Sequence, residues 1–330
     1  MPSLSELKTN ITHLSLPDNY YSIGMGMLIL NGSKSQALGE KIAIGLGLNF
    51  ENVATRRFPD GETYVRIETN VKGRDAVIVQ TMFPDQNDAL MEFLLIADTL
   101  KDMEVNSIIG VVPYLAYARQ DRKFQPGESL SMKTVIELMK AVGVNKLITV
   151  DTHYQHMEPG KFSLFGIPCI NVSAGRILLK HIREKIDHDL MTIGPDLGSS
   201  EMIKYATGEE MVLTKEKRCP ICGLPATQCK CKIQKKKYEI TDIESKYNFT
   251  GKNIVILDDI IASGGTMIKA VKKVKSEGAK KVVAAATHGL FMKDSLIQLK
   301  ELTDYLIVTD SIFTPVSDVS VAPLIVETLK

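Results

Sequence analysis

The sequence lacks an excess of charge of either sign. Its 40 Lys and Arg residues and 39 Asp and Glu residues leave a formal net charge of +1 at pH 7. A net charge this small excludes recruitment of nucleic acid by the whole chain, so any binding of phosphate groups must be local. Long apolar runs are also lacking, which argues against a membrane-spanning helix. Residues 1–8 contain no apolar core, so we expect no signal peptide there.

Cysteine is scarce, with 5 in 330 residues. Cys219, Cys222, Cys229 and Cys231 fall within one short segment, and Cys169 stands alone. This clustering is typical of a metal site rather than a disulfide framework, and it favours a reducing, cytoplasmic location. The pattern C-x-x-C-G followed by C-x-C can supply four thiolates to a structural zinc ion. The alternatives are reduced, solvent-facing thiols or a redox disulfide.

What the chain does contain is typical of a globular α/β protein. The hydrophobic content of 44% excludes disorder, and 330 residues suggest two domains at about 150 residues each. From residue 27 onward, a short apolar strand, a polar loop and an amphipathic helix alternate, which predicts parallel sheets flanked by helices. Strands are expected at residues 27–30, 76–79, 108–112 and 147–150, and again at 169–172, 190–193, 253–257, 282–286 and 306–308.

These elements predict two similar domains, over residues 25–168 and 169–330. Between residues 214 and 238 the alternation breaks into charges and cysteines, with neither a helical nor a strand period. We interpret residues 218–237 as a Cys- and Lys-rich insertion that forms a zinc knuckle. Its lysines are expected to be solvated rather than to bind nucleic acid.

Residues 254–266, IVILDDIIASGGT, carry the clearest chemical signal. They predict a buried strand ending in two acids, followed by a small-residue loop that begins a helix. Helix amides, close backbone approach at the glycines and two hydroxyl groups would hold a phosphate monoester, and the acids would accept hydrogen bonds from sugar hydroxyls. There is no Walker-type lysine, and the alternative is an ordinary glycine turn with solvated acids. The residues expected to bind are Asp258, Asp259, Ser263, Gly264, Gly265 and Thr266.

This segment resembles the phosphoribosyl pyrophosphate loop of type I phosphoribosyltransferases. Four further motifs occur in the order found in the ribose-phosphate pyrophosphokinase family: FPDGE at 58–62, YARQDRK at 117–123, DTH at 151–153 and SVA at 320–322. The resemblance implies two phosphoribosyltransferase-type domains. It also implies transfer of the diphosphoryl group of ATP to the C1 hydroxyl of ribose 5-phosphate, with Mg²⁺, giving phosphoribosyl pyrophosphate and AMP.

The resemblance implies an ATP site that is shared between subunits. Arg119 and Gln120 would hold ATP in one subunit, and Phe58, Asp60 and Glu62 would reach its base and ribose from a neighbouring subunit. We therefore expect a homo-oligomer, from a dimer up to a hexamer.

The resemblance also implies magnesium ligands and catalytic cations. His153 and Asp196 match the family's magnesium positions, and each follows a predicted strand, where α/β sheets bind ligands. Taken alone, His153 is more typical of a structural hydrogen bond. In the family a Lys-x-Arg pair neutralises transition-state charge, and this chain has KEKR at 215–218. Lys215 matches the lysine, whereas the arginine position is open between Lys217 and Arg218.

Two other interpretations remain open at this stage. The chain could be a catalytically inactive regulatory subunit, because its insertion lies beside the expected catalytic loop. It could also be a phosphoribosyltransferase that consumes phosphoribosyl pyrophosphate, which would explain the second half alone. The acids and the arginine retained at the expected positions argue against the first, and the motif at 117–123 argues against the second.

Overall fold

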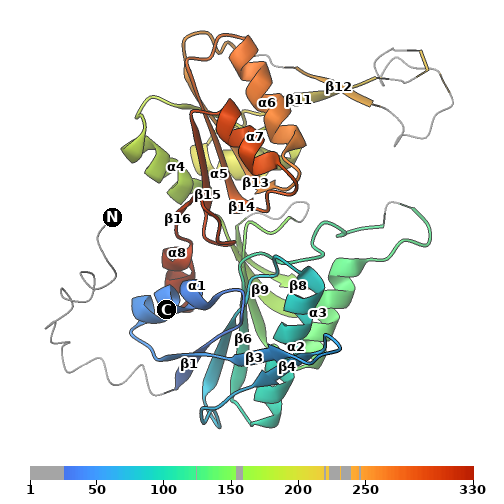
Figure 1. Cartoon of the computed structure of the whole chain (residues 1–330), viewed down its shortest axis with the longest axis vertical. Coiled ribbons are helices and arrows are strands. Elements are labelled where there is room, and N and C mark those ends of the chain that lie inside the picture. The colour runs from blue at the N-terminus through green and yellow to red at the C-terminus, as the bar shows by residue number, and fades with distance from the viewer. Residues whose placement is uncertain are drawn as a thin grey trace, which may run out of the picture.

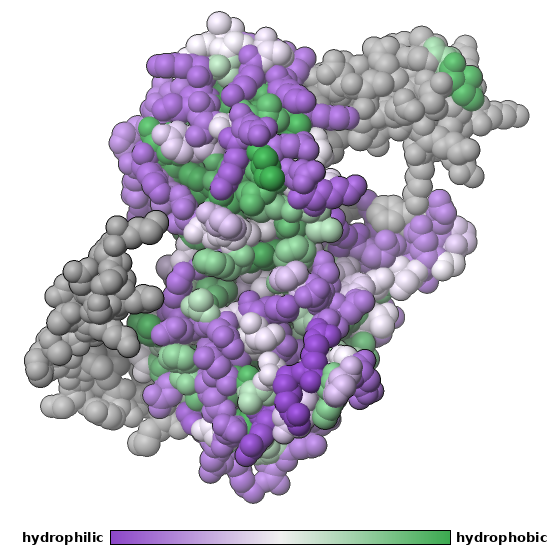
Figure 2. Space-filling model, viewed as in Figure 1, coloured by the Kyte–Doolittle hydropathy of each residue, from purple (hydrophilic) through white to green (hydrophobic). Residues whose placement is uncertain are grey.

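The computed structural model describes residues 26–123, 125–153, 159–218, 221–222, 231, 239–244 and 247–330. Two predominantly parallel sheets flanked by helices form the lower and upper parts of Figure 1, which confirms the predicted fold class. Hydrophilic residues cover most of the face shown in Figure 2. Within the described ranges, no helix is both long and apolar enough to cross a membrane.

The first sheet has the strand order β2-β1-β5-β6-β7-β9-β8, and only β8 runs antiparallel to its neighbour. Leu28 and Leu30 of β1 pack on one face of this sheet and Ile29 packs on the other, as expected for a parallel strand with two covered faces. The strands are β1 (Met27–Asn31), β2 (Phe50–Asn52), β5 (Asp75–Val79), β6 (Ser107–Val112), β7 (Lys146–Val150), β8 (Gly160–Leu164) and β9 (Ile167–Val172). The helices of this part are α1 (Gln36–Leu46), α2 (Gln86–Asp102) and α3 (Ser131–Ala141).

The second sheet has the order β10-β13-β14-β15-β16 and is parallel throughout. Ile254 and Ile256 of β13 pack with α6 on one face, and Val255 and Leu257 pack with α4 on the other. Each fully buried side chain of this size contributes about 1.5–3 kcal/mol. The strands are β10 (Met191–Ile193), β13 (Asn253–Ile261), β14 (Lys281–Gly289), β15 (Tyr305–Thr309) and β16 (Ser317–Val319). The helices are α4 (Gly175–Lys185), α5 (Ser200–Thr207), α6 (Gly265–Ser276) and α7 (Ser295–Leu302).

The last helix, α8 (Ala322–Leu329), leaves the second sheet and packs against α1 of the first (Figure 1). Gly45 of α1 permits this approach, because a Cβ atom there would lie 2.8 Å from Cγ2 of Val326. Ile325 of α8 is fully buried in the same cluster as Ile42 of α1 and apolar residues of β13 and β14. One hydrophobic core therefore extends across both sheets.

The strand at residues 169–172 belongs to the first sheet, not the second as we predicted. It is part of β9, which pairs with β7 and β8, so the predicted boundary after Pro168 falls inside a strand. The chain crosses to the second sheet only with α4. The apolar stripe of α4, which includes Leu178 and Ile182, packs with residues of β14 and β15.

The segment predicted to lack regular structure begins with a strand. β11 (Thr214–Arg218) pairs antiparallel with β12 (Glu239–Glu244), and the two form an arm that projects from the upper part of Figure 1. Arg218 lies opposite Glu239 in this pairing. The sequence of β11, TKEKR, lacks the apolar alternation by which a packed strand is recognised, which is why the pattern did not predict it.

Candidate active site

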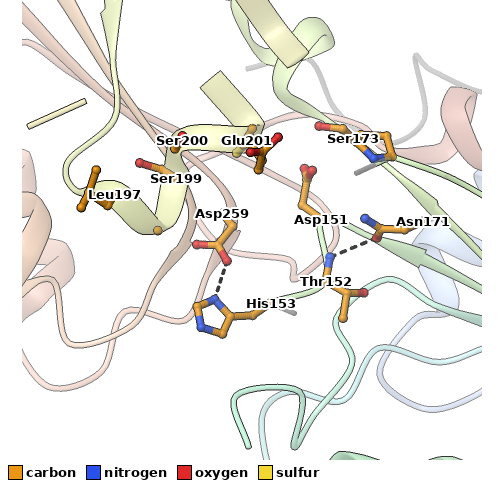
Figure 3. Close-up of a pocket in the computed structure, with 13 residues that line it drawn as sticks. Asp151, Thr152, His153, Asn171, Ser173, Leu197, Ser199, Ser200, Glu201 and Asp259 are labelled. Carbon is orange, nitrogen blue, oxygen red and sulfur yellow. Dashed lines mark hydrogen bonds and ion pairs between the residues drawn. The ribbon is translucent and has the colours of Figure 1, made fainter. Parts of the chain in front are cut away.

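The carboxyl ends of the two sheets meet at the middle of the molecule. Thr152 and His153 follow β7 of the first sheet, and Asp259 lies on β13 of the second. His153 Nδ1 is 2.7 Å from Asp259 Oδ2, although the two residues are 106 positions apart in the sequence (Figure 3). The fold thus joins the DTH motif to the acid pair, at the edge of parallel sheets where ligands bind.

The pKa values of the two adjacent acids at this contact are shifted in opposite directions. The hydrogen bond to Asp259 raises the pKa of His153. Burial alone would raise the pKa of Asp259, but the hydrogen bond and the charge of His153 outweigh burial and lower it. Burial raises the pKa of Asp258 well above its ordinary value, and the nearby charges of Asp259 and Asp196 add to this effect. Burial thus favours the neutral form of Asp258, and His153 favours the carboxylate form of the adjacent Asp259.

Both Asp258 and Asp259 lie within β13 rather than after it. We predicted a strand that ends at residue 257, but β13 continues to Ile261 and stays paired with β14. Ile260 and Ile261 are buried in two different hydrophobic clusters, and this burial extends the strand beyond the acids. Residues before and after the two acids are paired with β14, so the strand fixes the position of the acids more firmly than a loop would.

Residues 262–264 connect β13 to α6, so the predicted small-residue loop is short and Gly265 and Thr266 already belong to the helix. Gly264 has a φ of 75°, a left-handed backbone, and a Cβ atom there would lie 2.7 Å from Cβ of Ser295. This glycine occupies the N-cap position and has no side chain with which to cap the helix. Because N–H groups at a helix N-terminus donate hydrogen bonds to anions, the start of α6 suits a phosphate group. Ser263 and Gly265 are exposed, and Thr266 is half-buried.

A cavity of about 350 Å³ opens beside the His153–Asp259 pair (Figure 3). One wall follows β7 and β9, and the other is formed by the 3-10 helix η2 (Leu197–Ser199) and the start of α5. Asp196 caps η2, accepting a hydrogen bond at Oδ1 from the Gly198 amide at 2.7 Å. The polar lining residues are Asp151, Thr152, His153, Asn171, Ser173, Ser199, Ser200, Glu201 and Asp259.

A second cavity, of about 440 Å³, is lined by Arg119 and Gln120. Its other walls include Tyr117 from the first sheet and Leu290 and Met292 from the second. Arg119 and His153 line a narrow cleft in common, which places the histidine beside both the arginine and the acid pair. The structure therefore brings together the YARQDRK, DTH and acid-pair motifs from three separate parts of the chain.

The residues at this centre fit a magnesium ion that is bound together with phosphate. Mg²⁺ prefers carboxylate oxygens, and it usually takes one or two of them while keeping water and substrate phosphates as further ligands. Asp196 follows β10 and Asp258 lies on the neighbouring strand β13 of the second sheet, and the charge of Asp196 raises the pKa of Asp258. Across the described ranges, no three His, Cys, Asp or Glu residues form a ready-made metal cluster. A site of this kind would be completed by the substrate.

Phe58, Asp60 and Glu62 lie away from these cavities, on the turn between β3 (Ala54–Arg57) and β4 (Thr63–Arg66). The turn is closed by the Phe58 amide, which donates to the Glu62 carbonyl at 2.9 Å. Phe58 is 38% exposed, and the Arg56 guanidinium lies 5.1 Å from its ring centroid. These residues line neither the cavity of about 350 Å³ nor the cavity of about 440 Å³, so a role in an ATP site there would require a neighbouring subunit.

The predicted catalytic cations lie on β11: Lys215, Lys217 and Arg218. Among the predicted zinc ligands, Cys222 is exposed and Cys231 partly exposed, whereas Cys219 and Cys229 lie outside the described residues. The zinc knuckle stays a prediction.

Several polar residues of the site were not predicted from the sequence. Asn171 is buried at the end of β9, and its Oδ1 accepts the Thr152 amide at 3.1 Å. Ser173, Ser199 and Ser200 line the same cavity. Asn171 lies near the end of β9 and Ser173 follows it, whereas Ser199 ends η2 and Ser200 begins α5. A polar residue near the carboxyl end of a strand is the signal that could have identified Asn171 and Ser173.

Comparison with known proteins identifies the family. Residues 27–143 match the N-terminal domain of ribose phosphate pyrophosphokinase, and residues 229–319 match a phosphoribosyl transferase domain. A ribose-phosphate pyrophosphokinase of Methanopyrus kandleri is 33% identical over 309 residues, which cover 92% of this chain and 99% of that protein. The chain belongs to the ribose-phosphate pyrophosphokinase family.

Other members of the family agree with this assignment. A ribose-phosphate pyrophosphokinase of Thermococcus kodakarensis is 34% identical over 282 residues, covering 84% of this chain and 91% of that protein. The crystal structure of phosphoribosylpyrophosphate synthetase from Mycobacterium smegmatis is similar, with a TM-score of 0.76 and 26% identity over 92% of this chain and 97% of that chain. The predicted family, and with it a transferase function, is confirmed.

Proposed function

We propose that this chain transfers the diphosphoryl group of ATP to the C1 hydroxyl of ribose 5-phosphate. The C1 oxygen attacks the β-phosphorus, the bond between the β-phosphorus and the α-phosphate oxygen breaks, and AMP leaves. The products are phosphoribosyl pyrophosphate and AMP. The observation that carries this proposal is the His153–Asp259 contact, because it joins the acid pair of the phosphate loop to the segment beside Arg119.

The second sheet would hold the sugar phosphate. The uncapped amides at the start of α6 suit the 5-phosphate, and Gly264 lets the backbone approach it. Asp259 would accept a ribose hydroxyl as a carboxylate. The neighbouring Asp258, whose pKa is raised, would donate to or accept from a second hydroxyl.

The nucleotide would bind on the side of the first sheet. Arg119 and Gln120 line the cavity of about 440 Å³, and an arginine is suited to planar contacts with phosphate or base. Phe58, Asp60 and Glu62 would complete this site from a neighbouring subunit, so we propose a homo-oligomer. The exposure of the β3–β4 turn supports this arrangement, since a partner could reach it.

The chemistry needs alignment and positive charge more than covalent catalysis. Bound through His153 and Asp196, Mg²⁺ would withdraw charge from the phosphate oxygens. Lys215, with Lys217 or Arg218, would add positive charge from the β11 arm. The thiolates of Cys219, Cys222, Cys229 and Cys231 would hold a structural zinc ion beyond that arm, and we propose a cytoplasmic enzyme.

One mixture tests the proposal. The purified chain is incubated with Mg²⁺, ATP and ribose 5-phosphate, and AMP and phosphoribosyl pyrophosphate are measured by mass spectrometry. Equal amounts of both products are expected. Asp259→Asn should lose activity, whereas Asp102→Asn, an exposed acid at the end of α2, should retain it. If AMP does not form, the proposal fails, and release of pyrophosphate from phosphoribosyl pyrophosphate and a base would indicate a phosphoribosyltransferase instead.

A further inference from the structure

A buried polar network joins the two sheets just behind the His153–Asp259 contact. His288 Nε2 lies 2.9 Å from the Val150 carbonyl oxygen, and its Nδ1 lies 2.8 Å from Ser311 Oγ. Next to it on β14, Thr287 Oγ1 donates to Asp151 Oδ2 at 2.6 Å. We call these five residues the junction network. Two consecutive residues of β14 thus hold two consecutive residues at the end of β7.

The hydrogen-bond chemistry of the junction network assigns the ring protons. A carbonyl oxygen only accepts, so His288 Nε2 must carry the proton that binds Val150. Burial lowers the pKa of His288 to about 4, so the ring is neutral at pH 7 and its Nδ1 accepts from Ser311. The single hydroxyl proton of Ser311 has two acceptors within reach, the Thr287 carbonyl at 2.9 Å and His288 Nδ1 at 2.8 Å. Thr309 Oγ1 donates to the same carbonyl at 2.7 Å, so that carbonyl is satisfied when the Ser311 proton binds the ring. Both ring nitrogens are satisfied at once.

The junction network lies directly between the two halves of the site. Val150 precedes His153 by only three positions, and His288 is the strand neighbour of Ile260, the residue after Asp259. Asp151 also has a φ of 35°, an unfavourable backbone for a residue other than glycine, and its carboxylate accepts the Ala174 amide at 2.8 Å as well as the Thr287 hydroxyl. The turn that carries His153 is therefore held by hydrogen bonds to Asp151 and not by the backbone preference of its residues.

We propose that His288 is a positioning residue that fixes the end of β7, so that His153 meets Asp259 across the two sheets. His288 is only 1% exposed, so it acts through its neighbours rather than by touching a substrate. Its contribution is to set the separation of the nucleotide-binding and sugar-phosphate-binding halves. A displacement of about 1 Å in such an alignment can cost about 100-fold in rate. This inference rests on the proposed function only for its kinetic test.

The kinetic test uses His288→Leu and His288→Gln. His288→Leu should lower kcat about 100-fold while KM for both substrates stays nearly unchanged, because the substrates still bind but are misaligned. Gln can donate to the Val150 carbonyl, so His288→Gln should recover most of the lost rate. His181→Gln, a histidine of α4 outside the junction network, is the matched control and should retain wild-type kcat. If His288→Leu fails to fold, Thr287→Val removes the neighbouring bond and should also lower kcat.

A double variant separates positioning from general destabilisation. If His288 acts through His153, His288→Leu should cost almost nothing further in a His153→Ala background. Hydrogen–deuterium exchange gives a readout that needs no activity. In His288→Leu, amides of residues 148–153 should exchange faster while those of β1 do not. The positioning role would be overturned if the rate losses of the two single variants multiplied in the double variant, or if amide exchange rose equally in residues 148–153 and in β1. If the wild type were inactive but His288→Leu still raised exchange only in residues 148–153, only the proposed function would be overturned.

Discussion

Lowering the pH from 7 to 5 should weaken the folded state through His288. The imidazole is 1% exposed, and burial lowers its pKa to about 4, compared with 6.5 for an ordinary histidine. Between these two values the unfolded chain binds a proton that the folded chain does not bind. The free energy of unfolding therefore falls as the pH falls through this window, and the linkage relation gives a loss of about 2 kcal/mol at pH 5.

A second group opposes this trend in the wild-type chain. Burial raises the pKa of the Asp151 carboxyl to about 6, from 3.8. Here the folded chain binds the proton at a higher pH than the unfolded chain does, so the contribution of Asp151 to stability increases as the pH falls. At pH 5 it offsets about 1 kcal/mol of the stability lost through His288. The pH dependence of the wild type alone mixes these two effects with those of His153, Asp258 and Asp259, whose pKa values are also shifted. The difference between wild type and His288→Gln isolates the histidine, because Gln does not titrate and the other groups are present in both proteins.

The assay is urea unfolding at pH 7 and pH 5, followed by far-ultraviolet circular dichroism. The stability advantage of wild type over His288→Gln should shrink by about 2 kcal/mol between the two pH values. An advantage that is equal at both pH values would show that His288 is not a buried neutral imidazole, and the proton assignment in the junction network would then be wrong.

Three further predictions concern substrates, subunits and metal. Asp259→Asn should lower kcat/KM for ribose 5-phosphate at least about tenfold, since a charged hydrogen bond is worth about 1.5–3 kcal/mol. Asp258→Asn should lower kcat/KM less, because the raised pKa of Asp258 already favours its neutral form. Equal losses in steady-state kinetics would contradict this. Inactive Glu62→Ala and Asp259→Asn chains should regain activity when mixed, and no recovery after demonstrated subunit exchange would refute a shared site. Cys222→Ser together with Cys229→Ser should abolish one zinc per chain in elemental analysis without loss of the circular dichroism signal, whereas zinc-free wild type purified under reducing conditions would refute the knuckle.

The parts of the fold that follow hydrophobic periodicity could be predicted from the sequence. The central strands bury both faces, as Leu28, Ile29 and Leu30 do, so their apolar runs stand out from the polar loops. β9 was predicted as a strand but assigned to the wrong sheet, because apolar residues identify burial and not the neighbouring strand. The β11–β12 arm was missed because its charged residues carry no alternation.

The motifs of the site could be predicted from the sequence, but the way in which they meet in space could not. The acids of residues 258–259 and the DTH motif could each be found in the sequence, since both lie near strand ends. Their contact through His153 could not be found, because it depends on two sheets meeting at their carboxyl ends. The junction network could not be predicted from the sequence for the same reason. Thr287 and His288 look like ordinary polar residues at the end of an alanine-rich strand until the opposite sheet is in place.

The C-terminal helix α8 has a consequence for biosynthesis. It is synthesised long after α1, yet Ile325 completes a core that contains α1. Ile42 and its neighbours therefore lack this part of their packing until α8 has been made. A nascent chain stalled before α8 would expose this apolar surface, and we expect such a chain to be a preferred client of chaperones.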